Sequence, residues 1–163
     1  MKTPTTFQKS RRAAFAAALF MLLPLASANL GGVALAKKDP VYTGKFSSAA
    51  AGGYDVTAYF SESRPVKGKS KFTAKYRGAK WSFASKENME KFLADPEKYA
   101  PQYGGYCAWA VAQGKTASGD PLLWTVHGGK LYLNYNKKIN DRWSRDKDAL
   151  IAKGDKNWPE VLN

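Results

Sequence analysis

The sequence of 163 residues has a single cysteine, Cys107, and a single histidine, His127. One cysteine cannot close an intramolecular disulfide, so stability must come from packing, and the unpaired thiol is buried, metal-bound, reactive or joined to another chain. One thiolate and one imidazole also fall short of the ligand set of a structural zinc site. Because His127 flanks the Gly128-Gly129 turn and no strand-turn-helix nucleophile elbow is present, a Ser-His-Asp hydrolase is not expected.

Acidic residues are missing from residues 1–36, which contain four Lys and Arg. The apolar run at residues 13–25 is shorter than the roughly 20 residues of a membrane-spanning helix. Small residues follow it, and the pattern predicts a secretory signal peptide that is cleaved near Ala36 or near Ala28. The general secretory and twin-arginine routes both stay open, and an uncleaved tether is the alternative. No cysteine lies near either cleavage site, which excludes a lipoprotein anchor. The expected location is periplasmic or secreted.

Acidic residues are also half as common as basic ones, with 13 Asp and Glu against 26 Lys and Arg. Removal of residues 1–36 leaves 22 basic and 13 acidic residues, a net charge of +9. Nucleic acid is not an expected partner, because an exported protein meets little of it. The excess charge indicates either a solvated lysine-rich surface or attraction to anionic lipid headgroups, envelope polymers or another envelope protein.

Apolar and polar residues alternate in two pairs of short runs, which is typical of β-hairpins. The first pair comprises residues 72–76 and 81–83, and the second pair residues 124–126 and 131–135. We therefore expect the α+β class, with a small antiparallel sheet built from two β-hairpins and helices packed on it. Residues 37–53 are expected to be a flexible leader and residues 54–163 to form the domain. No internal repeat is visible in the sequence, although a hairpin followed by a helix is expected twice.

Two helices are expected from capping residues and apolar spacing. Ser85 is the expected N-cap of a helix that stops before Asp95-Pro96 and whose apolar stripe comprises Met89, Phe92 and Leu93. Residues 137–153 are expected to form one basic helix near the C-terminus.

Cys107 follows Gly104-Gly105-Tyr106 and precedes a short predicted helix that ends at Gly114. A thiol at a helix start faces free backbone N–H groups and the positive end of the helix dipole. We therefore expect this thiol to ionise more readily than a free one. The alternative is that Cys107 is a small apolar side chain of the core.

Several runs of this sequence resemble the YHS domain, a small α+β module of metal-transport ATPases, aromatic-hydroxylase components and single-domain exported bacterial proteins. The resemblance rests on residues 81–92 and on Asp95-Pro96-Glu97-Lys98-Tyr99, and it extends through residues 54–60, 100–108 and 130–135. In this wider form the chain is similar to the single-domain exported type, and the similarity covers nearly all of residues 37–163.

In metal-binding members of that family, the motif Phe-Cys-Ser-x-x-Cys-x-x-x-Phe spaces two thiolates to close on a soft metal ion. Here Phe83, Ser85 and Phe92 keep the frame, but Ala84 and Asn88 stand at the two cysteine positions. The resemblance therefore implies the fold and metal handling in general, with copper as the best guess, but not the thiolate site of the family.

Three functional hypotheses follow. The leading one is a non-enzymatic module that binds copper or another transition-metal ion through Cys107, with His127 and Asp55 as weaker ligands; Asp55 is also interpreted as the N-cap of a short helix. The second is a thiol-reactive or redox accessory protein that uses Cys107. The third is a non-catalytic envelope interaction module. Aromatic residues that converge near Cys107 would line a small-ligand pocket, and the candidates are Tyr54, Tyr59, Tyr103, Tyr106, Trp109 and Trp124.

Overall fold

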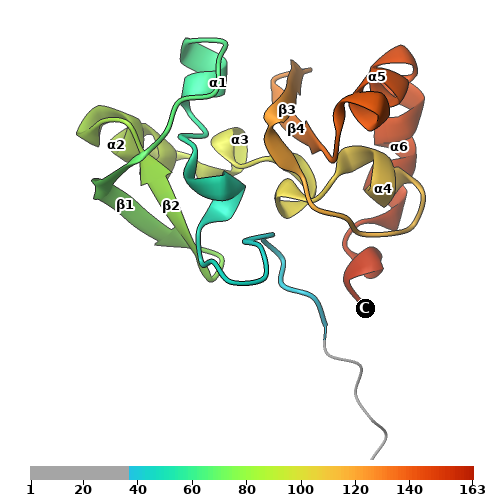
Figure 1. Cartoon of the computed structure of the whole chain (residues 1–163), viewed down its shortest axis with the longest axis horizontal. Helices are drawn as coiled ribbons and strands as arrows, with labels where there is room; N and C mark the ends of the chain where they lie inside the picture. The colour runs from blue at the N-terminus through green and yellow to red at the C-terminus, as the bar shows by residue number, and fades with distance from the viewer. Residues whose placement is uncertain (1–36) are drawn as a thin grey trace, which may run out of the picture. The chain divides into compact units, whose positions relative to one another are not determined.

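The computed structural model describes residues 37–163, which belong to one compact unit (Figure 1). The predicted signal peptide lies outside the described residues. Within the described part of the chain, no helix is both long enough and apolar enough to cross a bilayer. The elements in chain order are η1 (Ala50–Gly53), α1 (Ala58–Ser61), β1 (Lys69–Tyr76), β2 (Ala79–Phe83), α2 (Lys86–Ala94), α3 (Pro96–Tyr99), η2 (Gln102–Gly105), α4 (Ala108–Ala112), β3 (Asp120–His127), β4 (Lys130–Asn134), α5 (Lys137–Arg145), α6 (Lys147–Asn157) and η3 (Glu160–Leu162).

Both predicted β-hairpins are present, and each forms a two-stranded antiparallel sheet of its own. Arg77-Gly78 connects β1 to β2, and Gly128-Gly129 connects β3 to β4; all four residues have positive φ. Two consecutive left-handed residues match the twist of the flanking strands in a tight hairpin. The α+β class is confirmed, with two small sheets in place of the single sheet that was expected.

The helix that follows the first hairpin has the predicted start and end. The Ser85 hydroxyl accepts a hydrogen bond from the backbone N–H of Asn88 at 3.1 Å, and α2 ends at Ala94. Phe92 is fully buried and packs on Phe83, with ring centroids 5.1 Å apart. Leu93, in contrast, is 52% exposed, so its predicted place in the apolar stripe is wrong. Its neighbour Phe92 already fills the space above the hairpin, and Leu93 points one helical step away from it.

The predicted helix at residues 137–153 is two helices, α5 and α6, because Asp146 interrupts it with φ −140° and ψ 40°. Asp95 has a similar conformation, φ −151° and ψ 76°, between α2 and α3. The same break therefore occurs after each hairpin-helix pair.

The match between the two halves extends along the chain as an internal repeat, of which the sequence indicated only the hairpin followed by a helix. The order η1-α1-β1-β2-α2-α3 is followed by η2-α4-β3-β4-α5-α6. β1 begins at residue 69 and β3 at residue 120, 51 residues later; α2 begins at residue 86 and α5 at residue 137, again 51 residues later. Each hairpin also has its register irregularity after the first residue of its first strand, at Lys69 and at Asp120. We call residues 50–99 the first repeat and residues 102–157 the second repeat.

Each repeat begins with a left-handed turn that ends in a glycine pair. Tyr103 has φ 55° and Gly104 has φ 61°, and the corresponding residues of the first repeat, Ala51 and Gly52, have φ 47° and φ 57°. A Cβ atom on Gly104 would lie 1.9 Å from the carbonyl oxygen of Pro40, so only glycine fits there.

The hydrophobic core consists of two clusters, and β4 contributes to both. Leu131 and Leu133 belong to the cluster that contains Trp81, Phe83 and Phe92 of the first repeat. Tyr132, between them, belongs to the cluster that contains Trp143 and Val111 of the second repeat. Because successive residues of a strand point to opposite faces, β4 links the two cores.

Residues 37–53 differ from the expected leader because they pack against the rest of the chain. Val41 and Ala50 are buried and belong to the first cluster. The backbone N–H of Lys38 donates to the carbonyl of Leu162 at 2.8 Å, and that of Tyr42 donates to the carbonyl of Gly104 at 2.9 Å. The sequence signal was weak because only a few apolar residues of this segment make the contacts.

Candidate functional site

Asp55 is fully buried in the first repeat, and its carboxylate accepts four hydrogen bonds. Oδ1 accepts from the backbone N–H of Thr57 at 2.9 Å and from its hydroxyl at 2.7 Å. Oδ2 accepts from the backbone N–H of Ala84 and from the side-chain amide of Asn88, both at 2.8 Å. The predicted N-cap role is wrong, because Thr57 is the N-cap of α1. Asp55 lies two residues earlier and connects the start of α1 to the junction between β2 and α2.

Cys107 occupies the matching place in the second repeat and is 1% exposed. Its Sγ lies 3.6 Å from Oδ1 of Asn134, which also accepts a hydrogen bond from the backbone N–H of Trp109 at 3.2 Å. Burial raises the pKa of the thiol, and hydrogen bonds from the backbone N–H groups of Ala110, Tyr135 and Trp109 offset only part of that effect. The prediction of a readily ionised thiol is wrong, since α4 has only five residues and desolvation outweighs its N–H groups.

The surroundings of Asp55 and Cys107 correspond residue by residue. Asp55 and Cys107 are 52 residues apart. The backbone N–H of Thr57 points to the Asp55 carboxylate, and that of Trp109, also 52 residues later, points to the Cys107 sulfur. Ala84 and Tyr135, 51 residues apart, supply the N–H group from the hairpin-to-helix junction. Asp55 therefore connects the segment after Gly52-Gly53 to the β1–β2 hairpin, and Cys107 connects the segment after Gly104-Gly105 to the β3–β4 hairpin.

His127 lies at the end of β3, where it pairs with Lys130 of β4. Its Nε2 lies 2.6 Å from Oδ1 of Asp148 in α6, and the imidazole is about one-third exposed. The first repeat has a similar contact, in which the Tyr76 hydroxyl donates to Glu97. His127 thus connects a hairpin to the following helix, as Tyr76 does 51 residues earlier.

A comparison with protein-family models matches residues 57–103 to the YHS domain. The match spans most of the first repeat, including the junction between β2 and α2 around which Asp55 is bound. Searches of curated proteins and of solved structures found no significant match.

The residues at the junction between β2 and α2 do not fit a thiolate-bound metal ion of the kind that metal-binding YHS domains hold, in agreement with the absence of both cysteines from the motif. Both positions that hold cysteine in metal-binding members here present N–H donors to Asp55, from the Ala84 backbone and the Asn88 side chain. Hydrogen-bond donors repel a cation, and every polar contact of the Asp55 carboxylate is already made by the protein.

The predicted ligands Cys107, His127 and Asp55 are not brought together. Asp55 bonds within the first repeat, Cys107 faces Asn134, and His127 faces Asp148. Across residues 37–163, no three His, Cys, Asp or Glu side chains are grouped so that they could hold a metal ion.

The six aromatic residues predicted to line one pocket near Cys107 are divided between the two cores. Tyr54, Tyr59 and Trp124 pack in the first cluster, and Tyr103, Tyr106 and Trp109 pack in the second. The Tyr59 ring lies 5.2 Å from that of Trp124, and its hydroxyl donates to the carbonyl of Pro121 at 2.8 Å. Packing in two cores, as opposed to one ligand cleft, accounts for these side chains.

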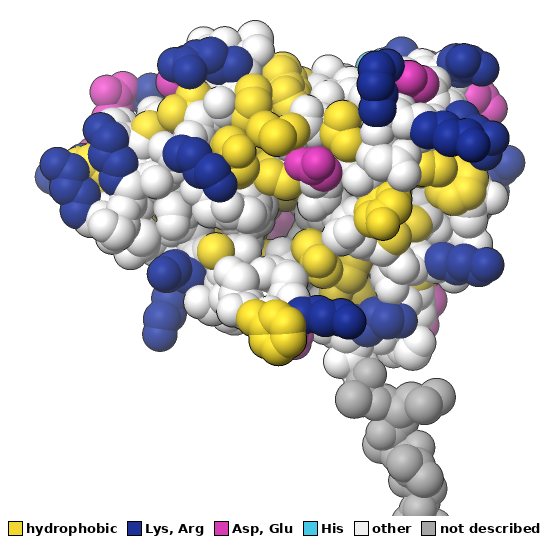
Figure 2. Space-filling view, viewed as in Figure 1, with side chains coloured by type: hydrophobic (Ala, Val, Ile, Leu, Met, Phe, Trp, Pro, Cys, Tyr) yellow, Lys and Arg dark blue, Asp and Glu magenta, His cyan; other side chains and the backbone are white. Residues whose placement is uncertain are grey.

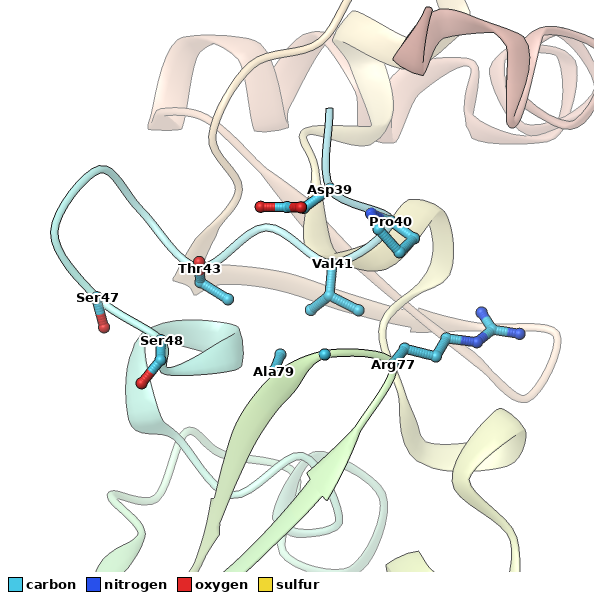
Figure 3. Close-up of a pocket in the computed structure, with 9 residues that line it drawn as sticks. Asp39, Pro40, Val41, Thr43, Ser47, Ser48, Arg77 and Ala79 are labelled. Carbon is cyan, nitrogen blue, oxygen red and sulfur yellow. The ribbon is translucent and has the colours of Figure 1, made fainter. Parts of the chain in front are cut away.

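The largest pocket described, about 470 Å³, lies instead beside the N-terminal segment of the domain (Figure 3). Val41, Thr43 and Ala79 lie around it, whereas the Arg77 guanidinium points away from them and pairs with Glu97 at 2.6 Å. The remaining lining residues are Asp39, Pro40, Ser47, Ser48 and Gly78. Sequence reasoning missed this pocket because residues 37–53 were expected to lie outside the domain.

Proposed function

We propose that this protein is an exported, non-catalytic YHS-domain module of the bacterial envelope that acts by binding. The observation that carries the proposal is the closed hydrogen-bond network of Asp55 at the junction where metal-binding relatives are expected to hold a metal. The buried thiol of Cys107, whose pKa is raised, supports the same conclusion for thiol chemistry. Export rests on residues 1–36, whose composition is that of a signal peptide.

Metal handling, the leading expectation from the sequence, is tested directly by titration of the purified protein with Cu(I), Cu(II), Zn(II) and Ni(II). We expect no binding tighter than about micromolar that is lost in Cys107→Ala. His127→Ala and Cys107→Ala are matched variants, because each removes one predicted ligand of the second repeat, the first partly exposed and the second buried. Cys107-dependent binding at nanomolar concentration would restore the copper hypothesis and overturn a purely non-metal function.

Export is tested by fractionating cells that express the full chain and determining the N-terminal residue of the product. We expect release with the periplasmic contents and a chain that begins at Lys37, or at Asn29 if the earlier site is used. Replacement of Arg11 and Arg12 by Lys separates the two routes, because twin-arginine export depends on the arginine pair. Retention of the unprocessed chain in the cytoplasm would contradict the proposal.

A further inference from the structure

Phe46 is the most exposed large hydrophobic residue among those described. Its side chain is 101% exposed, whereas Leu93, Leu122 and Tyr135 are each between 52% and 55% exposed. Single exposed apolar residues are ordinary on a protein surface, but most keep part of their side chain in contact with a neighbour. A phenylalanine without such contact leaves its whole apolar area to water unless another molecule covers it.

The loop that carries Phe46, residues 43–48, is held at both ends and projects between them. Before it, Val41 is buried and the Tyr42 N–H donates to the carbonyl of Gly104 at 2.9 Å. After it, the Lys80 N–H donates to the carbonyl of Ser48 at 2.8 Å, and Ala50 is fully buried. We call residues 43–48 the Phe46 loop. Fixed ends reduce the ordering cost of presenting Phe46 to a partner.

Basic residues outnumber acidic ones beside this loop, where Asp39 lines the same pocket as Lys38 and Lys45. Lys45 precedes Phe46, and Lys38 and Lys45 line the same shallow pocket. The backbone of Lys80 contacts Ser48 at the far end of the loop. Asp39 is the only acidic residue between residues 37 and 54. Figure 2 shows Lys and Arg side chains spread over the visible face and far fewer Asp and Glu side chains among them.

We propose that the Phe46 loop docks the protein on an anionic membrane surface, with the Phe46 ring in the interfacial region and Lys38 and Lys45 near the lipid phosphates. An aromatic ring flanked by lysines is the combination that amphipathic membrane anchors use. The inference rests on the proposed function, because it requires an envelope location.

A protein partner is a poorer fit for the same loop. The central part of a protein–protein interface is depleted in lysine and needs a broad apolar area. Here a single aromatic side chain stands among lysines, which suits headgroup phosphates and a thin apolar layer.

The test is co-sedimentation of the processed protein, recovered from the periplasm, with vesicles of phosphatidylcholine alone or mixed with phosphatidylglycerol. We expect binding to the anionic vesicles only, weaker at about 0.5 M than at about 0.05 M salt because added ions screen the lysines. Phe46→Ala should weaken the partition about tenfold, Phe46→Leu should restore much of it, and Lys45→Glu should weaken it further at low salt. Leu93→Ala is the matched control, because it removes another exposed apolar side chain outside the loop, and it should bind as the wild type does.

Equal partition of the wild type and Phe46→Ala would overturn the inference, as would equal binding to both vesicle types. A wild type that binds neither vesicle would also overturn it and would leave a protein as the partner of the loop. The results of the vesicle assay do not depend on the export assay or on the metal titration. Failure of the membrane-docking inference is therefore distinguishable from failure of the proposed function.

Discussion

Removal of the buried Asp55 carboxylate should destabilise the fold far more than removal of an exposed carboxylate such as that of Asp95. In Asp55→Ala, the N–H groups of Thr57 and Ala84, the Thr57 hydroxyl and the Asn88 amide all lose their acceptor in a buried site. Thr57 and Asn88 can turn toward other partners, but the two backbone N–H groups cannot. With about 1–3 kcal/mol for each of these two unsatisfied groups, we expect the free energy of unfolding to fall by about 2–6 kcal/mol. The melting temperature should fall by roughly 8–20 °C.

The assay is urea unfolding followed by tryptophan fluorescence, with Asp95→Ala as the matched control. Asp95 is also an aspartate that accepts from a backbone N–H, that of Lys98 at 3.2 Å, but in an exposed position. Its loss should cost only about 1 kcal/mol, the usual value of a helix cap. If Asp55→Ala fails to fold, Asp55→Asn provides the measurement, because it turns one acceptor into a donor that faces other donors. A loss below about 1 kcal/mol in Asp55→Ala would refute the claim that the buried donors depend on this carboxylate.

Four further outcomes are expected. Alkylation of Cys107 in the native protein should be slow at neutral pH, and fast alkylation there would contradict its burial. The pKa of the Cys107 thiol is higher in the folded protein than its ordinary value of 9.0, so the unfolded chain loses this proton at a lower pH than the folded protein does. Deprotonation therefore favours the unfolded state, and the stability of the wild type relative to Cys107→Ala should decrease as the pH rises above about 9. Urea unfolding curves at several pH values measure this difference. Gly104→Ala should cost more than Gly128→Ala by at least about 2 kcal/mol, since both have positive φ but only Gly104 meets the Pro40 carbonyl; equal losses in urea would show that the Pro40 contact is relaxed. Leu93→Gln should change stability by less than about 0.5 kcal/mol, and a larger loss in the same assay would mean that Leu93 packs against the core after all.

The local part of this fold could be predicted from the sequence. The two hairpins and the Ser85 cap depend on residues that are close in the chain, namely the alternation around Trp81 and the hydroxyl three residues before Asn88. The end of α2 before Asp95-Pro96 is equally local, because the residue before a proline avoids the helical conformation.

The rest depended on contacts between distant residues. Nothing near Asp55 in the sequence indicates that its carboxylate meets Ala84 and Asn88, about thirty positions away. The internal repeat is hidden in the sequence because the corresponding buried positions carry different residues, such as Phe83 and Asn134, while the backbone path is the same. The N-terminal segment resembles a flexible leader because a single valine, Val41, and hydrogen bonds to Gly104 and Leu162 hold it.

The two repeats satisfy the same backbone donors with different chemistry, and this difference explains why Cys107 is not a second Asp55. In the first repeat, one carboxylate accepts from both the turn and the junction, and the residue at position 83 is an apolar phenylalanine. A thiol is too weak an acceptor to do the same. In the second repeat, Asn134 occupies the position that corresponds to Phe83. Its Oδ1 accepts a hydrogen bond from the backbone N–H of Trp109, and its side-chain amide donates to Oδ1 of Asn140 at 3.1 Å. The buried asparagine thus supplies a stronger acceptor than the thiol for the Trp109 N–H, while the thiol packs beside it and faces the N–H groups of Ala110 and Tyr135. On this reasoning the lone cysteine packs beside Asn134, and the binding role proposed above calls for residues other than Cys107.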